Sequence, residues 1–191
     1  MINLPNLILA SGSPRRAEIL TSVGWPFEKH VPDIDESEIA GEQPETYVQR
    51  LAATKAEAIA AAYPTLLVLG ADTTVVIDGR IIGKPADLDD AKQMLSDLSG
   101  NWHEVLTGVA LVQGEKKHVG FQRTRVKFAK MSAGEIDFLA ERGEPLDKAG
   151  AYAVQAQAAL FIEKIDGDYW NVVGLPVSLI YELAESFAET A

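Results

Sequence analysis

Two long strand-type segments follow each other with almost no connection between them, and this pair constrains the fold more than any other feature of the sequence. Residues 102–112 and 117–128 are rich in β-branched and aromatic side chains, and they meet at Gln113-Gly114, a dipeptide that favours a turn. Strands joined by so short a connection form an antiparallel hairpin. The sequence therefore predicts a sheet that is not purely parallel.

Helix-type periodicity alternates with short apolar runs over the rest of the chain, which indicates a single α/β domain over residues 1–191. Neither an internal repeat nor a Gly/Ser-rich linker marks a boundary within it. Helices are expected over residues 14–23, 44–62, 88–98, 132–141 and 176–187. Further strands are expected over residues 7–10, 27–31, 66–69, 73–77 and 80–82, with a last hairpin formed by 160–165 and 169–173.

Polar residues at the expected helix starts support these boundaries. Ser13 stands at the N-cap position before Pro14, which suits the first helical position. Asp87 is expected to cap the third helix, and Ser132 with Glu135 has the spacing of a capping box.

Composition excludes several classes of function. The sequence contains no cysteine, which rules out disulfides, thiolate nucleophiles and iron–sulfur clusters. Its formal net charge of −11 argues against a surface that grips nucleic acid, because such affinity comes largely from Lys and Arg. Neither a signal-peptide pattern nor an apolar stretch of membrane-spanning length is present. A cytoplasmic protein without nucleic-acid or membrane partners is the simplest expectation.

The first expected strand leads through a turn of small residues into a helix, an arrangement that suits anion binding. Ser11, Gly12 and Ser13 form the turn, and Arg15 and Arg16 follow in the first helical turn. Helix N–H groups, hydroxyls and guanidinium groups all donate hydrogen bonds to phosphate oxygens. The alternative is an ordinary capped helix with exposed arginines. The basic residues beside turns that could receive a small polyanion are Arg15, Arg16, Lys55, Lys84 and Lys148.

Carboxylates in two places could hold a divalent cation. Asp72 follows the apolar run 66–69 and Gly70, so we expect it where a buried strand ends, and Glu36 lies in an acidic loop. Two carboxylates that converge on a phosphate site would suit Mg²⁺ or Mn²⁺. The alternatives are a turn cap at Asp72 and a solvated acidic loop around Glu36.

Other common catalytic patterns are absent from the sequence. Gly83-Lys84-Pro85 is similar to the tail of a phosphate-binding P-loop, but Pro85 replaces the required Ser or Thr. The histidines lack metal-ligand spacing, and no Gly-x-Ser-x-Gly elbow surrounds Ser11 or Ser13. A serine hydrolase is therefore not expected.

Several spaced motifs, taken together and in order, resemble the Maf-like nucleotide pyrophosphatases. They span essentially the whole chain, which makes the set far more specific than any one member. The motifs are Ala-Ser-Gly-Ser-Pro-Arg-Arg at 10–16, Arg-Leu-Ala-Ala-Thr-Lys-Ala at 50–56, Gly-Ala-Asp-Thr at 70–73, Gly-Lys-Pro at 83–85, Asp-Lys-Ala-Gly-Ala-Tyr at 147–152 and Val-Val-Gly-Leu-Pro at 172–176.

The resemblance implies a metal-dependent hydrolysis of a nucleoside triphosphate between its α and β phosphates, giving a nucleoside monophosphate and pyrophosphate. It implies an elongated mixed β-sheet with flanking helices, two lobes around a central cleft, and a fold similar to inosine triphosphatases. By similarity, Asp72 is the general base and, with Glu36, a ligand of Mg²⁺ or Mn²⁺. The residues expected to contact the phosphates are Ser11, Arg16, Lys55 and Lys84.

Within this family, Arg15, Thr73 and Gln155 match the specificity positions of the branch that acts on dTTP and UTP. Gln155 can donate to and accept from a pyrimidine edge. The branch usually has Gly after this glutamine, whereas Ala156 follows here, and its methyl group is expected to narrow the pocket for the nucleobase. The alternatives are a 7-methyl-GTP pyrophosphatase and a non-catalytic nucleotide sensor linked with septum formation. The family also suggests a homodimer.

Overall fold

The computed structural model describes residues 4–188. Its elements are, in chain order, β1 (Leu7–Ala10), α1 (Pro14–Ser22), β2 (Phe27–His30), α2 (Pro44–Ala60), β3 (Leu67–Ile77), β4 (Arg80–Ile82), α3 (Leu88–Leu98), β5 (Trp102–Gln113), β6 (Lys116–Phe128), α4 (Ala133–Arg142), η1 (Pro145–Asp147), η2 (Ala149–Ala151), η3 (Gln157–Leu160), β7 (Ile162–Asp166), α5 (Tyr169–Val173) and α6 (Val177–Ala188).

The strands described between residues 4 and 188 form one seven-stranded mixed sheet. Its order is β2-β1-β3-β5-β6-β7, and β4 pairs with β3 beside this path. β1 is parallel to both β2 and β3, whereas β4 is antiparallel to β3 and β7 is antiparallel to β6. The prediction of a mixed sheet is therefore confirmed, and β5 and β6 are the neighbouring strands expected from the turn at Gly114.

The chain divides into two compact units. The first contains the chain up to Asp72, the segment Thr107–Gln122 and the chain from Gly174 onward. The second contains Thr73–Leu106 and Arg123–Val173. Helices α1, α2 and α6 belong to the first unit, and α3, α4 and α5 belong to the second.

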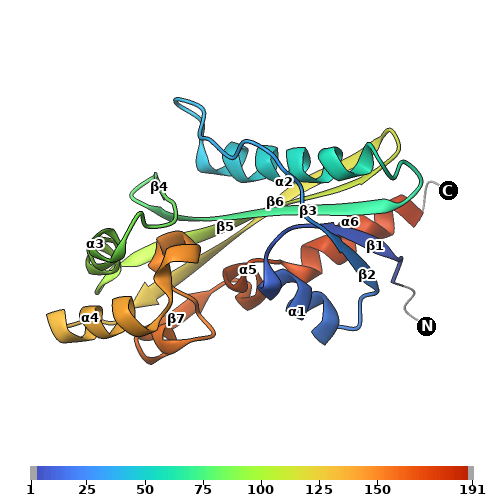
Figure 1. Ribbon diagram of the computed structural model, residues 1–191. Helices are drawn as coiled ribbons and strands as arrows, with labels where there is room; N and C mark the ends of the chain where they lie inside the picture. The colour runs from blue at the N-terminus through green and yellow to red at the C-terminus, as the bar shows by residue number, and fades with distance from the viewer. Residues whose placement is uncertain (1–3, 189–191) are drawn as a thin grey trace. The chain divides into compact units, whose positions relative to one another are not determined.

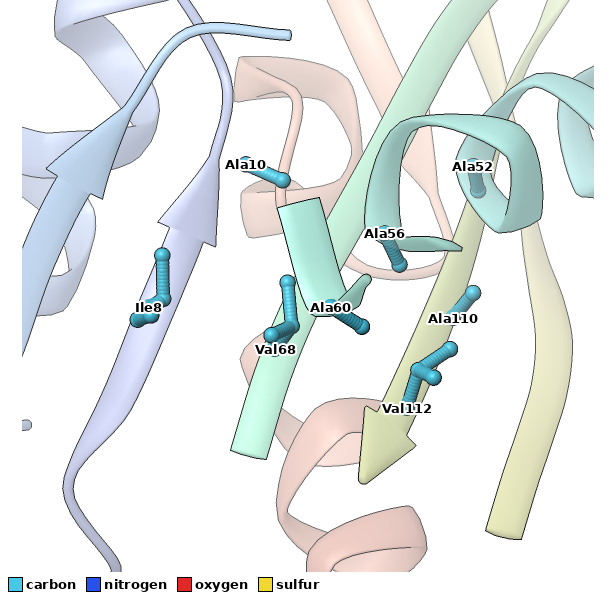
Figure 2. Close-up of a cluster of buried hydrophobic side chains, with 8 residues drawn as sticks. All are labelled: Ile8, Ala10, Ala52, Ala56, Ala60, Val68, Ala110 and Val112. Carbon is cyan, nitrogen blue, oxygen red and sulfur yellow. The ribbon is translucent and has the colours of Figure 1, made fainter. Parts of the chain in front are cut away.

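The core of the first unit is a layer of small side chains between α2 and the sheet. Ala52, Ala56 and Ala60 on α2 face strand residues that are also buried, and Figure 2 shows them beside Ile8, Ala10, Val68, Ala110 and Val112. α2 runs along the first part of β3 (Figure 1). Side chains of this size allow a helix to approach the strands closely, because little lies between the two backbones.

Two glycines make this approach closer still. A Cβ atom on Gly70 of β3 would lie 2.1 Å from the carbonyl oxygen of Ala52. A Cβ atom on Gly108 of β5 would lie 2.2 Å from the carbonyl oxygen of Val48. The helix backbone therefore rests directly on two strands, at places where only glycine leaves enough room.

In the second unit, α3 packs against α4 (Figure 1) and against the turns η1 and η2. The N–H of Gly150 donates to the carbonyl of Gly83 over 3.0 Å, which ties η2 to the segment after β4. Gly150 has a φ of +69°, and a Cβ there would lie 2.8 Å from Cγ2 of Val75. Backbone conformation and crowding both favour glycine at this position.

The predicted helix starts are confirmed, with one difference in detail. The Asp87 side chain accepts from the N–H of Asp90, and both hydrogen bonds of the Ser132–Glu135 capping box are present. Ser13 occupies the N-cap position of α1, but its side chain makes no capping hydrogen bond. Its N–H instead donates to the hydroxyl of Ser11.

Two expectations about strands are wrong. Residues 66–69 and 73–77 are not separate, because β3 runs unbroken through Gly70, and Asp72 lies inside this strand rather than at a strand end. Residues 169–173 form α5 rather than the second strand of a hairpin. The carboxylate of Asp168 accepts from the N–H of Trp170 over 2.7 Å, and this local cap favours a helical turn over an extended segment.

Within residues 4–188, no helix is both long enough and apolar enough to span a bilayer.

Candidate active site

Asp72 is a buried carboxylate in the middle of β3, with only 8% of its surface exposed. It lies two residues beyond Gly70, and alternate residues of a strand point to the same face. The face that Gly70 turns toward α2 is therefore also the face of the Asp72 side chain. The close seating of α2 thus brings a helix side chain within reach of this carboxylate.

Lys55 of α2 is that side chain, and it links two carboxylates from different parts of the first unit. Its Nζ lies 2.6 Å from Oδ1 of Asp72 and 2.7 Å from Oε1 of Glu36. The Lys55 and Asp72 side chains are buried, whereas the Glu36 side chain is half exposed. The structure therefore brings together three of the predicted site residues around one ammonium group.

Burial raises the pKa of Asp72, and the nearby charges of Lys55 and Arg16 oppose this shift. The charge of Glu36 adds a smaller upward effect. A carboxylate with a raised pKa is a stronger base than a solvated one, and a nearby ammonium keeps it ionised. This environment makes Asp72 a candidate for a general base.

Arg16 and Ser11 lie together at the turn between β1 and α1. Nη1 of Arg16 donates to Oγ of Ser11 over 3.0 Å and to the carbonyl of Ala71 over 2.9 Å, and its Nε donates to the carbonyl of Gly174 over 2.9 Å. Burial lowers the pKa of Arg16, while the charge of Asp72 opposes this shift. The guanidinium thus fixes the turn to the residue before Asp72, and it adds positive charge near that carboxylate.

The loop that carries Glu36 contacts two residues of α2 for which the sequence predicted no role, Tyr47 and Arg50. Arg50 of α2 binds both carboxylate oxygens of Glu42, each over 2.7 Å, and the hydroxyl of Tyr47 donates to the carbonyl of Glu36 over 3.3 Å. Arg50 begins the second of the quoted motifs, but the motif alone gave no indication of its partner.

The remaining predicted residues are Arg15, Thr73, Lys84 and Gln155. Arg15 is partly exposed in the first turn of α1. Thr73 follows Asp72 in β3 and, like Lys84 and Gln155, belongs to the second unit. Lys84 is exposed just after β4, and Gln155 is exposed on a turn before η3. Their contact with a nucleotide stays a prediction.

Lys148, the other basic residue noted beside a turn, is buried and donates to the Asp147 carboxylate over 2.6 Å and to the carbonyl of Glu144. Its ammonium is thus engaged within its own segment.

The donor set fits a hard divalent cation that is shared with a substrate. Glu36 and Asp72 converge on one positive group, and both offer carboxylate oxygens of the type that Mg²⁺ and Mn²⁺ prefer. Between residues 4 and 188, no group of three or more His, Cys, Asp or Glu side chains forms a complete protein cage. Mg²⁺ sites built from one or two carboxylates usually complete their coordination with water and substrate phosphates.

Comparison with known structures defines the class of fold. The structure is similar to that of the Staphylococcus aureus Ham1 protein, with a TM-score of 0.54 and 15% sequence identity over 95% of this chain and 98% of that chain. At this level of identity the likeness concerns the fold alone, which is a mixed α/β sheet with flanking helices.

Comparison of sequences gives the family. Residues 6–187 match the family described as Maf-like protein, and the chain belongs to this family. A dTTP/UTP pyrophosphatase of Symbiobacterium thermophilum is 50% identical over 96% of this chain and 95% of its own length. A dTTP/UTP pyrophosphatase of Hahella chejuensis is 49% identical over 95% of this chain and 92% of its own length. One of Bacillus cytotoxicus is 47% identical over 95% of this chain and 96% of its own length.

Proposed function

We propose that this chain is a nucleoside triphosphate pyrophosphatase that hydrolyses dTTP and UTP to the monophosphate and pyrophosphate. The observation that carries the proposal is the sequence identity of 47–50% to three dTTP/UTP pyrophosphatases over nearly their whole length. The contacts of Lys55 with Asp72 and Glu36 support it, because they supply a buried base beside a cation.

In the proposed reaction, a water oxygen attacks the α phosphorus and the bond from that phosphorus to the bridging oxygen breaks. Asp72 accepts the proton of the attacking water, and pyrophosphate leaves with the bonding electrons. Water is a poor nucleophile until a base begins to remove its proton, so a carboxylate with a raised pKa suits this role.

Positive groups of the chain would stabilise the charge that develops on the phosphoryl oxygens. Lys55 is already beside Asp72, and Ser11 and Arg16 lie at the start of α1, where the positive end of the helix dipole also favours an anion. We assign Lys84 to the phosphates by its place in the Gly-Lys-Pro motif.

A divalent cation completes the proposal. Mg²⁺ or Mn²⁺, held by Glu36 and Asp72, would supply further positive charge to the phosphates. The Lys55 ammonium already contacts both carboxylates, so Lys55 and the cation would together balance their negative charge.

We assign recognition of the nucleobase of the substrate to Arg15, Thr73 and Gln155. A glutamine amide presents a donor and an acceptor, which matches the edge of uracil or thymine. Ala156 has a methyl group that a glycine would lack, and this group would narrow the pocket beside Gln155.

The proposal is tested by incubating the purified protein with Mg²⁺ or Mn²⁺ and a panel of nucleoside triphosphates that includes dTTP, UTP, CTP, GTP and 7-methyl-GTP. We expect monophosphate and pyrophosphate from dTTP and UTP, with the Asp72→Asn variant as the control for contaminating hydrolases. Preference for 7-methyl-GTP would overturn the substrate assignment. Binding of dTTP without turnover would support a sensor instead, and orthophosphate as the first product would contradict cleavage between the α and β phosphates.

A further inference from the structure

Helix α2 holds the acidic loop through an ion pair that takes no part in the chemistry proposed above. Nε and Nη2 of Arg50 each donate over 2.7 Å to a different oxygen of Glu42. Only 6% of the Glu42 side chain and 27% of the Arg50 side chain are exposed. A two-point pair that is shielded from water is stronger and more directional than an exposed pair.

The same helix also binds the loop backbone beside Glu36. Nη2 of Arg50 donates to the carbonyl of Ser37 over 3.1 Å, and the hydroxyl of Tyr47 donates to the carbonyl of Glu36 over 3.3 Å. The Arg50 guanidinium lies 5.6 Å from the centre of the Tyr47 ring, within the range of a cation–π contact. Arg50 therefore reaches the loop at both ends of the segment 37–42, and it packs on the residue that holds Glu36.

Electrostatics within this group agree with the geometry. The hydrogen bonds from Arg50 lower the pKa of Glu42, and those same bonds raise the pKa of Arg50. Burial raises the pKa of Tyr47 to about 12, so its hydroxyl stays protonated and can donate to the loop. The pair is thus charged, and the tyrosine is a donor, at any pH near neutrality.

The Glu36 carboxylate is only partly enclosed, although the Lys55 ammonium that it meets is buried. Half of the Glu36 side chain is exposed, compared with 8% of the Lys55 side chain. The loop around Glu36 is largely exposed and contains no helix or strand between β2 and α2. The backbone contacts made by Tyr47 and Arg50 therefore add to the Lys55 contact in setting the position of this carboxylate.

We propose that Arg50 is a positioning residue that holds the loop 35–42 against α2, and so keeps the Glu36 carboxylate at Lys55 and Asp72. The kinetic consequence rests on the proposed function, whereas the ordering of the loop does not. Arg50 itself contacts no reacting atom; it acts through Glu36.

Hydrogen exchange measured by mass spectrometry tests the ordering in the protein without metal or nucleotide. Arg50→Met should speed exchange over residues 35–42 by about 10- to 100-fold, which corresponds to the loss of one or two charge-assisted hydrogen bonds. Arg50→Lys, which keeps the charge but cannot bind both oxygens, should give a smaller increase. Glu57→Gln is the matched control, because it removes an exposed pair with Lys117 from the same helix and should leave the loop unchanged.

Kinetics test whether Arg50 acts through Glu36. We expect Arg50→Met to lower kcat/KM for dTTP and to raise the Mn²⁺ concentration needed for half-maximal rate. In a Glu36→Gln background, Arg50→Met should lower kcat/KM for dTTP by less than about twofold, because the carboxylate that Arg50 positions is already lost.

The outcomes separate the two claims. Unchanged exchange in Arg50→Met would overturn the positioning role, whatever the protein hydrolyses. Faster exchange with an equal kinetic loss in both backgrounds would show that Arg50 does not act through Glu36. A wild-type protein that turns over no nucleotide would overturn the proposed function, and the exchange measurement would still decide whether Arg50 orders the loop.

Discussion

Replacement of Gly70 by alanine tests whether the close packing of α2 on β3 is what brings Lys55 to Asp72. The added Cβ would lie 2.1 Å from the Ala52 carbonyl oxygen and 2.8 Å from the Ala56 backbone nitrogen. Ordinary van der Waals contact begins near 3.4 Å, so α2 would have to retreat from β3 by roughly 1 Å. Both contacts are with backbone, and no rotation of a side chain can relieve them.

The expected cost follows from this crowding. Overpacking of a well-packed core typically costs about 1–3 kcal/mol, and a clash with backbone falls at the upper end or beyond. For a chain of this size, about 3 kcal/mol corresponds to a fall in Tm of about 6–12 °C. A retreat of α2 also draws Lys55 away from Asp72, and a misplacement of about 1 Å can reduce catalysis by about 10²-fold.

Thermal unfolding followed by circular dichroism, with kcat measured well below the Tm, checks both effects. Gly134→Ala in α4 is the matched control, because no atom lies within 4 Å of its added Cβ and alanine is the better helix former. An unchanged Tm in Gly70→Ala would refute the close-packing argument. A lower Tm with wild-type kcat would refute the link between the seating of α2 and the site.

Three further perturbations have defined outcomes. Asp72→Asn should keep the far-ultraviolet circular dichroism spectrum and lose at least about 10²–10⁴-fold in kcat, and a folded variant with near wild-type turnover of dTTP would remove Asp72 from its role. Gln155→Ala should lower kcat/KM for dTTP by about 5- to 150-fold and narrow the preference over GTP, whereas an unchanged preference order with unchanged rates would place this side chain outside base recognition. Burial lowers the pKa of His103 from its usual 6.5 to about 3, so this neutral histidine stabilises the fold above pH 6.5, and its contribution is lost as the pH falls from there toward 3. Urea unfolding at pH 7 and pH 5 should therefore show wild type losing about 2 kcal/mol more than His103→Gln, and equal losses would contradict a buried neutral His103.

Local signals in the sequence predicted the helix starts well, because their chemistry is complete within a few residues. Ser132 and Glu135 bond to each other's backbone groups, and Asp87 bonds to the N–H three residues ahead. The turn at Gly114 likewise joins the neighbouring strands β5 and β6. Such features need no information about distant parts of the chain.

The strand errors arose where a distant contact or a cap overrides a local pattern. In the sequence, Gly70 indicates the end of a strand. In the structure it lies within β3, where the Ala52 carbonyl is so close that no larger residue fits. The segment 169–173 contains aromatic and β-branched residues, but Asn171 turns inward and donates to the carbonyl of Val105 and the hydroxyl of Thr124. A helical turn capped by Asp168 permits this arrangement, and no periodicity over five residues could have shown it.

The site could be predicted only in part, because some of its contacts join residues without a local sequence signal. Motifs indicated Lys55 and Asp72, the acidic loop and the family resemblance indicated Glu36, and in the structure Lys55 contacts both carboxylates. The Glu42–Arg50 pair has no comparable signal, since its members lie eight residues apart, one in the loop before α2 and one on the helix. Helical spacing rules apply only when both residues are on the helix.

Hydrolysis of dTTP in water labelled with oxygen-18 tests the proposed reaction most directly, because it reports which phosphorus the water attacks. Attack on the α phosphorus places the label in dTMP and leaves pyrophosphate unlabelled, as mass spectrometry of the two products would show. Label in pyrophosphate or in orthophosphate would contradict attack at the α position, and with it the assignment of Asp72 as the base that activates this water.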